Sequence, residues 1–182
     1  KDTSDVVFLE AYHNVRIYKS DNQVICDSLL YSGIDSIARL FKSPVIWNEV
    51  TNQLSSDSIQ VVMKDGVMEK GLLLSNAFVA FEEQPGKYYN QVKSPEMAGF
   101  FKDGELARFD ALGGAQMLMY LKDSTEVAYA NRKECKIISS ELQDGTLQKN
   151  FYFEGIKSNI FPIEDLPKDE MNLNGFVWRG GE

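Results

Sequence analysis

The sequence has few residues of the kinds that build catalytic or metal sites. Its 182 residues contain one histidine, His13, and two cysteines, Cys26 and Cys135. A lone histidine acts as a catalytic base only with partners from elsewhere in a fold, and no Gly-x-Ser-x-Gly elbow offers a nucleophile. Two cysteines are too few for a disulfide-built scaffold. We therefore expect His13 to be structural, and we expect no catalytic residue, no cofactor and no metal.

The sequence also lacks a basic surplus and long apolar runs. Lys and Arg number 19 against 27 Asp and Glu, for a net charge of -8, so no basic patch offers a footprint for phosphates and nucleic acid is not an expected partner. Apolar stretches such as GLLL and MLMYL are far shorter than the roughly 20 residues of a transmembrane helix. The chain opens KDTSDVVFLEAYHNV, without the charged-then-apolar pattern of a signal segment, as expected of a mature or trimmed chain.

The composition is that of a folded domain, with 43% hydrophobic and 25% charged residues. We predict one repeat-built domain over residues 1–161. Residues 162–182 contain two prolines and several acids, which predicts an irregular loop, and GFVW near the end is a possible last strand. This C-terminal segment belongs either to the same domain or to the start of a linker.

A repeat with a constant spacing organises the chain. In three segments an Asn precedes an Asp-Gly pair by 13 positions: NQLSSDSIQVVMKDG (52–66), NQVKSPEMAGFFKDG (90–104) and NRKECKIISSELQDG (131–145). Asn22 and Asp35 form a fourth copy, with Ser36 in place of Gly. Asp-Gly between β-type segments predicts a tight hairpin. The chain therefore reads as all-β, with about ten to fourteen short antiparallel strands and little or no helix.

Aligning the four copies on the Asn shows which positions keep the same type of residue. The second position after it is occupied by Val24, Leu54, Val92 and Lys133, and the seventh by Leu29, Ile59, Met97 and Ile138. Offsets of two and seven have opposite parity, so a flat strand would point them to opposite faces. Either both faces are buried, or a bulge near the Asp-Ser pair turns the strand, and we favour the bulge.

The two cysteines share the fourth position of the alignment, where the middle copies have Ser56 and Ser94. Three strand spacings separate them, or at least about 14 Å, because neighbouring strands lie about 4.8 Å apart. That distance exceeds the roughly 7 Å limit between the Cα atoms of a disulfide. We therefore predict free thiols.

Two stretches resemble the repeat of a known family: NVRIYKSDNQVICDSLLY and PVIWNEVTNQLSSDSIQVVM. They are similar to the repeat of the OstA-like (LptA-like) family of lipopolysaccharide transport proteins. In that repeat an apolar strand with Asn-Val or Gly-Val is followed by a polar turn. A second strand then begins with Ala, Ser or Cys, followed by Asp, a small residue and apolar residues, and it ends in an aromatic residue. The resemblance covers residues 12 to about 160 and weakens in the second half, where Pro95-Glu96 and Lys136-Ile137 replace Asp-Ser.

The resemblance implies a twisted antiparallel β-jelly roll, open at both ends, in the periplasm of a Gram-negative cell. Proteins of this family shield the acyl chains of lipopolysaccharide and pass the lipid along like-folded domains joined end to end, without catalysis. The implied partners are lipopolysaccharide or lipid A, other transport components that pair through edge strands, and further copies of this chain in an end-to-end homo-oligomer.

Ten apolar residues are our candidates for the lipid-binding interior: Val15, Ile17, Val24, Leu29, Leu54, Ile59, Met97, Met117, Met119 and Ile138. The segments GLLLSNAFVAF and AQMLMYL are apolar on both faces, which suits a lipid-filled interior, an edge that pairs with another domain, or a thick sandwich core. Flexible methionines suit variable acyl chains. The net charge of -8 predicts that the protein holds the tails and leaves an anionic headgroup in water.

Two other functions stay open at this point. One is a β-sandwich scaffold or adhesin-type module that binds protein or glycan without lipid. The other is a carbohydrate-active enzyme, for which a pair of carboxylates such as Glu82 and Glu83 would be needed. Trp47 and Trp178 fit either core packing or contact with a ligand.

Overall fold

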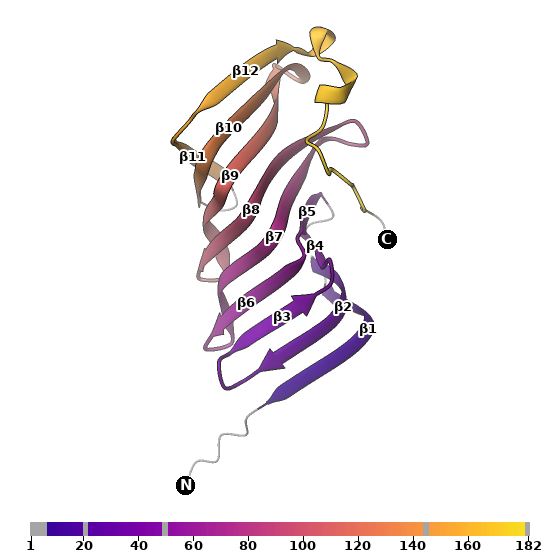
Figure 1. The fold of residues 1–182 in the computed structure, drawn as a ribbon, viewed down its shortest axis with the longest axis vertical. Helices are drawn as coiled ribbons and strands as arrows, with labels where there is room; N and C mark the ends of the chain where they lie inside the picture. The colour runs from indigo at the N-terminus through magenta and orange to yellow at the C-terminus, as the bar shows by residue number, and fades with distance from the viewer. Residues whose placement is uncertain (1–6, 20–21, 49–50, 144–145, 181–182) are drawn as a thin grey trace.

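The structure is a computed structural model that describes residues 7–19, 22–48, 51–143 and 146–180. All of its strands join one antiparallel sheet (Figure 1). Two short 3-10 turns follow, η1 (Ile163–Asp165) and η2 (Lys168–Glu170). The twelve strands are β1 (Phe8–Lys19), β2 (Asn22–Ser32), β3 (Ile37–Phe41), β4 (Val45–Asn48), β5 (Asn52–Ser55), β6 (Ser58–Lys64), β7 (Val67–Gln84), β8 (Tyr88–Lys102), β9 (Glu105–Asp123), β10 (Glu126–Gln143), β11 (Thr146–Phe153) and β12 (Lys157–Pro162).

The all-β prediction is confirmed, but several strands are much longer than predicted. Strands β7 to β10 run for 15 to 19 residues. They are long because each continues through a bend without losing its backbone pairing. Strands β8 and β9 keep the same neighbours on both sides of the bend, whereas β7 pairs with β6 before it and with β5 after it. Likewise β2 pairs with β3 and β4, and β10 pairs with β11 and β12.

The bends line up as one corner that divides the sheet into two walls. Wall A comprises residues 8–12, 28–41, 58–74, 96–112, 137–143 and 146–153. Wall B comprises residues 15–19, 22–25, 45–48, 51–55, 77–94, 115–135 and 157–162. Because the walls share strands, the hydrophobic core lies between two parts of one continuous sheet.

The corner is built from bulges in which two residues lie opposite one. The two-residue side has positive φ at both positions, as at Ser75 (63°) and Asn76 (54°), or at Gly113 (84°) and Gly114 (110°). The register of β7 against β8 jumps from Leu74 to Ala77 over this pair. Positive φ values re-aim the chain and raise its local twist. The bulge predicted at the Asp-Ser motif is therefore confirmed.

Small residues at the fourth position of the repeat lie on the strand that has the single residue of each bulge. The Ser56 hydroxyl donates to the Ser58 carbonyl at 2.7 Å, and the Ser94 hydroxyl donates to the Glu96 carbonyl at 2.8 Å. The Cys135 thiol lies 3.1 Å from the Ile137 carbonyl in the same way. Cys26 and Cys135 are buried free thiols, as predicted. Ser56, Ser94 and Cys135 each close a bend with the same local hydrogen bond, so serine and cysteine serve alike at this position.

The residue that follows each fourth-position residue contacts the neighbouring strand or the turn beside it. Asp27 forms an ion pair with Lys42 at 3.0 Å, and the Asn76 amide donates to Asp57 at 2.9 Å. The hydrogen bond from Lys42 holds the pKa of Asp27 below its ordinary value. In the degenerate copies Pro95 packs beside Gly113, and Lys136 pairs with Glu154 at 2.8 Å. Different side-chain contacts thus stabilise the same bend in all four copies.

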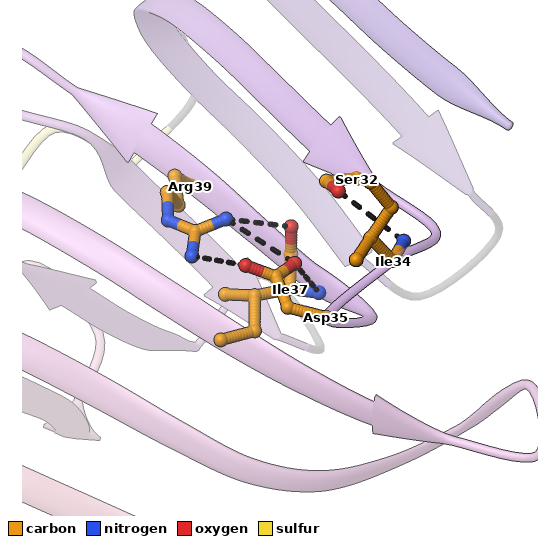
Figure 2. Close-up of polar contacts among 5 residues, drawn as sticks. All are labelled: Ser32, Ile34, Asp35, Ile37 and Arg39. Carbon is orange, nitrogen blue, oxygen red and sulfur yellow. Dashed lines mark hydrogen bonds and ion pairs between the residues drawn. The ribbon is translucent and has the colours of Figure 1, made fainter. Parts of the chain in front are cut away.

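The Asp of each described copy lies in a turn at the far edge of wall A. Asp65-Gly66 and Asp103-Gly104 have positive φ at both residues, as their hairpins require. Figure 2 shows the first copy, where Asp35 accepts from the Ile37 N–H at 3.1 Å and from the Arg39 guanidinium at 2.5 Å. The Arg39 hydrogen bond lowers the pKa of Asp35. The Asp of the fourth copy, at position 144, lies outside the described residues.

The C-terminal segment corrects one prediction, because GFVW does not form a strand. Residues 163–180, which we call the strap, instead cross the outer face of wall B (Figure 1). The strap places Leu166, Leu173, Phe176 and Trp178 against Phe78, Tyr88, Leu118 and Tyr120 in a second hydrophobic cluster. Its backbone bonds to side chains rather than to a strand: the Gln53 amide donates to the Val177 carbonyl and accepts from the Arg179 N–H, each at 2.7 Å.

Candidate functional site, an apolar interior between two walls

The seventh position of the repeat forms a row across the inner face of wall A. Each residue of this row pairs with the next across neighbouring strands: Ala11, Leu29, Leu40, Ile59, Leu73, Met97, Ala111, Ile138 and Tyr152. The residues between the predicted ones come from strands that the repeat alignment did not cover. Their apolar alternation was the signal that could have found them.

The second position forms the matching row on wall B. Its members are Ile17, Val24, Ile46, Leu54, Val79, Val92, Met117 and Lys133, again paired in that order. Residues of both rows pack in one hydrophobic cluster. The second and seventh positions have opposite parity and would face opposite sides of a flat strand. Because the strand bends at the corner between them, both positions face the same interior.

Nine of the ten predicted interior residues belong to this cluster. Leu29, Ile59, Met97, Met117 and Ile138 are buried, and Val15, Val24, Leu54 and Met119 are partly buried against them. Ile17 is the exception, with 40% of its surface exposed. It lies on the same face as Val15 but near the end of β1, where no further described strand covers it. Contact of these residues with lipid stays a prediction.

Exposure rises with distance from the corner. Beside the corner Ile59, Met97 and Ile138 are each 1% exposed. One step outward Val61 and Phe109 are only partly buried. On wall B the residues farther out include Phe81 at 40% and Ile160 at 60% exposed. The interior is therefore closed at the corner and apolar toward its mouth.

The repeated asparagines lie on wall B, one step outward from its apolar row. Asn22 pairs with Asn48, Asn48 with Asn52, and Phe81 links Asn52 to Asn90. The Asn48 amide donates to the Asn22 side chain at 3.1 Å. The constant 13-residue spacing thus measures the path from this position of wall B, round the corner, to the turn at the far edge of wall A.

The interior ends at edge strands. Among the described residues β1 pairs only with β2, while β11 and β12 each pair only with β10. Unpaired edges leave backbone N–H and C=O groups free to pair with another chain. Large apolar side chains are exposed on both ends, including Phe8, Leu9 and Tyr12 on β1 and Phe151, Phe153 and Ile160 on β11 and β12.

Residues considered for catalysis have local structural roles. Glu83 forms an ion pair with Lys122 and accepts from the Asn90 amide, both at 2.7 Å, while Glu82 accepts from the Gly86 N–H at 2.9 Å. His13 lies at the corner with a φ of 65°. No cluster of three or more metal-binding side chains occurs among the described residues. In the same part of the chain, no helix has the length and apolar character needed to cross a membrane.

Both tryptophans contact the strap side of wall B. Trp47 is buried, and its ring N–H donates to Gln53 at 3.2 Å. Trp178 lies on the strap and contacts the Tyr89 ring, with ring centres 4.8 Å apart. The core-packing interpretation is therefore correct for Trp47, and Trp178 helps to hold the strap in place.

Comparison with known proteins identifies the fold. The sequence matches no family model and no curated protein. A solved structure that resembles it is LptH from Pseudomonas aeruginosa, described as the LptA homologous periplasmic component of the conserved lipopolysaccharide transport device. The two chains share 14% identity with a TM-score of 0.56, over 78% of this chain and 95% of LptH. The chain therefore has the OstA-like jelly-roll fold, as its repeat predicted.

Proposed function

We propose that this chain is a non-enzymatic, periplasmic lipopolysaccharide transport module that shields lipid A acyl chains between its two walls. The observation that carries the proposal is the pair of facing, largely apolar rows. The row on wall A crosses nine strands, the row on wall B crosses eight, and both end at unpaired edges. The likeness to LptH in fold supports the same assignment. The apolar character of the rows suits burial of chains of methylene groups.

Acyl burial supplies the binding energy in this proposal. Each buried CH₂ group contributes about 0.8 kcal/mol, so a few chains offset the cost of ordering the lipid. Met97, Met117 and Met119 give the inner surface side chains that adapt to different chain lengths. With a net charge of -8, the protein surface as a whole does not attract an anionic headgroup, which stays at the mouth in water.

The packing supports entry of the acyl chains from the mouth. Ile59, Met97 and Ile138 fill the space beside the corner, so acyl chains would reach these rows from the mouth side. The partly buried residues farther out, such as Val61 and Phe109, would contact acyl chains as the walls separate. A separation of the walls at the mouth needs no change at the hydrogen-bonded corner.

The edge strands extend the proposal to partners. Strand β1 of one domain would pair with β11 and β12 of another like-folded domain, either a second copy or another transport component. Backbone hydrogen bonds give affinity to such strand addition, and side chains on the edges give specificity. The exposed Phe8 and Leu9 at one end and Phe151 and Phe153 at the other would become buried.

Photo-crosslinking tests the lipid-binding proposal. Benzoylphenylalanine is placed at Val61, which faces the interior, and at Val62, its neighbour on the opposite face of β6. We avoid the fully buried Ile59 because a large probe there would disturb the fold. The proposal predicts labelling by lipid A from Val61 and background labelling from Val62. Equal labelling from both positions would contradict it and favour a protein- or glycan-binding scaffold.

A further inference from the structure

The interior changes character at its C-terminal end. Within the two inner rows every residue from β1 to β9 is apolar, whereas β10 ends the wall B row with Lys133, which pairs with Ser158 of β12. One step outward, wall B is polar along most of its length because of its repeated asparagines, but wall A becomes polar only at β10 and β11. On wall A the Ser140 hydroxyl donates to the Asn150 side chain at 2.6 Å. On wall B the Ser158 hydroxyl donates to the Asn131 side chain at 3.1 Å. These pairs flank the point where the wall B row ends in Lys133.

Lys133, the last residue of the wall B row, is its one charged member. It occupies the second position of the fourth repeat, and its cross-strand neighbours are Met117 and Ser158. The side chain is half-buried, and its ammonium nitrogen lies 4.3 Å from the centre of the Tyr152 ring on wall A. It therefore reaches across the interior from one wall to the other. A cation above an aromatic ring is held there by the ring's quadrupole, without neutralisation of its charge.

No described carboxylate neutralises this cation. None of the ion pairs between described residues includes Lys133. The basic residues on either side of it are paired elsewhere, Arg132 with Glu170 on the outer face of wall B and Lys136 with Glu154 at the corner. Partial burial of a cation without an opposite charge costs free energy, so this position favours an anionic ligand.

We propose that Lys133 binds a phosphate group of the lipid at the C-terminal end of the interior. This inference rests on the proposed function. Acyl chains would lie along the apolar rows from β1 to β9, and the phosphorylated end of the lipid would lie at β10, so the molecule is bound in one direction. The ammonium group donates charge-assisted hydrogen bonds to the phosphate oxygens, and Asn131 and Ser158 lie beside it on the same wall. The remaining headgroup stays in water.

The test compares two lipids of identical acyl composition, lipid A with its phosphates and lipid A from which they have been removed. Their affinities are measured for the wild type, Lys133→Met and Lys133→Arg. Lys157→Met is the matched control, because it removes a lysine from the neighbouring strand on the opposite face. We expect Lys133→Met to reduce the preference for the phosphorylated lipid about tenfold, with binding of the dephosphorylated lipid retained. Lys133→Arg and Lys157→Met should keep the preference.

The outcomes separate this inference from the proposed function. If the wild type and Lys133→Met bind both lipids with the same preference, the phosphate site is wrong while acyl binding stands. If the wild type binds neither lipid, the proposed function itself fails. Inorganic phosphate is titrated separately, with the Tyr152 ring resonances as the reporter. Suppose that inorganic phosphate shifts the Tyr152 resonances to saturation while Lys133→Met keeps the lipid preference of the wild type. The site would then be assigned to a free anion, and the proposal would be overturned.

Discussion

Removal of the Gln91 side chain should release the strap from wall B. Gln91 is fully buried (0% exposed). Its amide donates to the Asn172 side chain at 2.7 Å and to the Tyr89 carbonyl at 3.1 Å, and its carbonyl oxygen accepts from the Leu173 N–H at 2.8 Å. In Gln91→Ala these three bonds are lost, and the buried Leu173 N–H is left without this acceptor.

The expected loss of stability follows from those bonds. A hydrogen bond contributes roughly 0.5 to 1.5 kcal/mol net, and a buried donor left unsatisfied costs about 1 to 3 kcal/mol. We therefore expect Gln91→Ala to lower the free energy of unfolding by about 3 kcal/mol, measured by urea denaturation. Hydrogen exchange should accelerate over residues 171–178, because the strap loses its central anchor.

Gln60→Ala is the control for this substitution. Gln60 is a half-buried glutamine on β6, and no hydrogen bond of its side chain is found within the described part of the chain. Its truncation should change stability by less than about 0.5 kcal/mol. If Gln91→Ala behaves like Gln60→Ala, with exchange over the strap unchanged, the reasoning about side-chain anchors is wrong.

Three further outcomes are expected. Burial raises the pKa of Tyr120 to about 12 from its ordinary value of 10. As the pH rises, the unfolded chain therefore loses this proton before the folded protein does. The free energy of unfolding should hold below about pH 10 and fall by roughly 1 to 3 kcal/mol toward pH 12. Urea unfolding across that range should show a smaller decline for Tyr120→Phe, and an equal decline would contradict the assignment. Gly113→Ala, at a φ of 84° beside Pro95, should cost about 1 to 2 kcal/mol and lower the midpoint of thermal unfolding; an unchanged midpoint would mean that the corner tolerates a side chain. Ile17→Lys on the exposed edge β1 should abolish concentration-dependent end-to-end growth in small-angle scattering without changing the circular dichroism, whereas unchanged growth would exclude β1 as the pairing edge.

Much of the fold could be predicted because local chemistry decides it. Asp-Gly pairs specify hairpins, and the small residue before each Asp specifies a bend. The bend survives even where Pro95 and Lys136 replace Asp, because its geometry needs only a single residue opposite a pair with positive φ. Strand length was underestimated for the same reason, since a bend that keeps its backbone pairing does not end the strand.

The strap could not be predicted, because no periodic pattern encodes it. Its course depends on two isolated side chains, Gln53 and Gln91, which substitute for a partner strand. Each bonds to a strap residue more than 80 positions away in the sequence. Lys133 is a different case. Its appearance at a position that is apolar in the other three copies was visible in the alignment, but only the structure shows that it faces Tyr152 across the interior.

The most direct test of the central claim is a methyl NMR measurement with lipid A that has a spin label near the end of one acyl chain. The two hydrophobic clusters provide an internal comparison, because one lies between the walls and the other lies under the strap. Acyl binding between the walls predicts strong broadening of the methyl signals of Leu54, Val61 and Met119, and little change at Leu118, Leu166 and Leu173. Broadening confined to the strap cluster, or absent from both clusters at saturating lipid, would contradict the account.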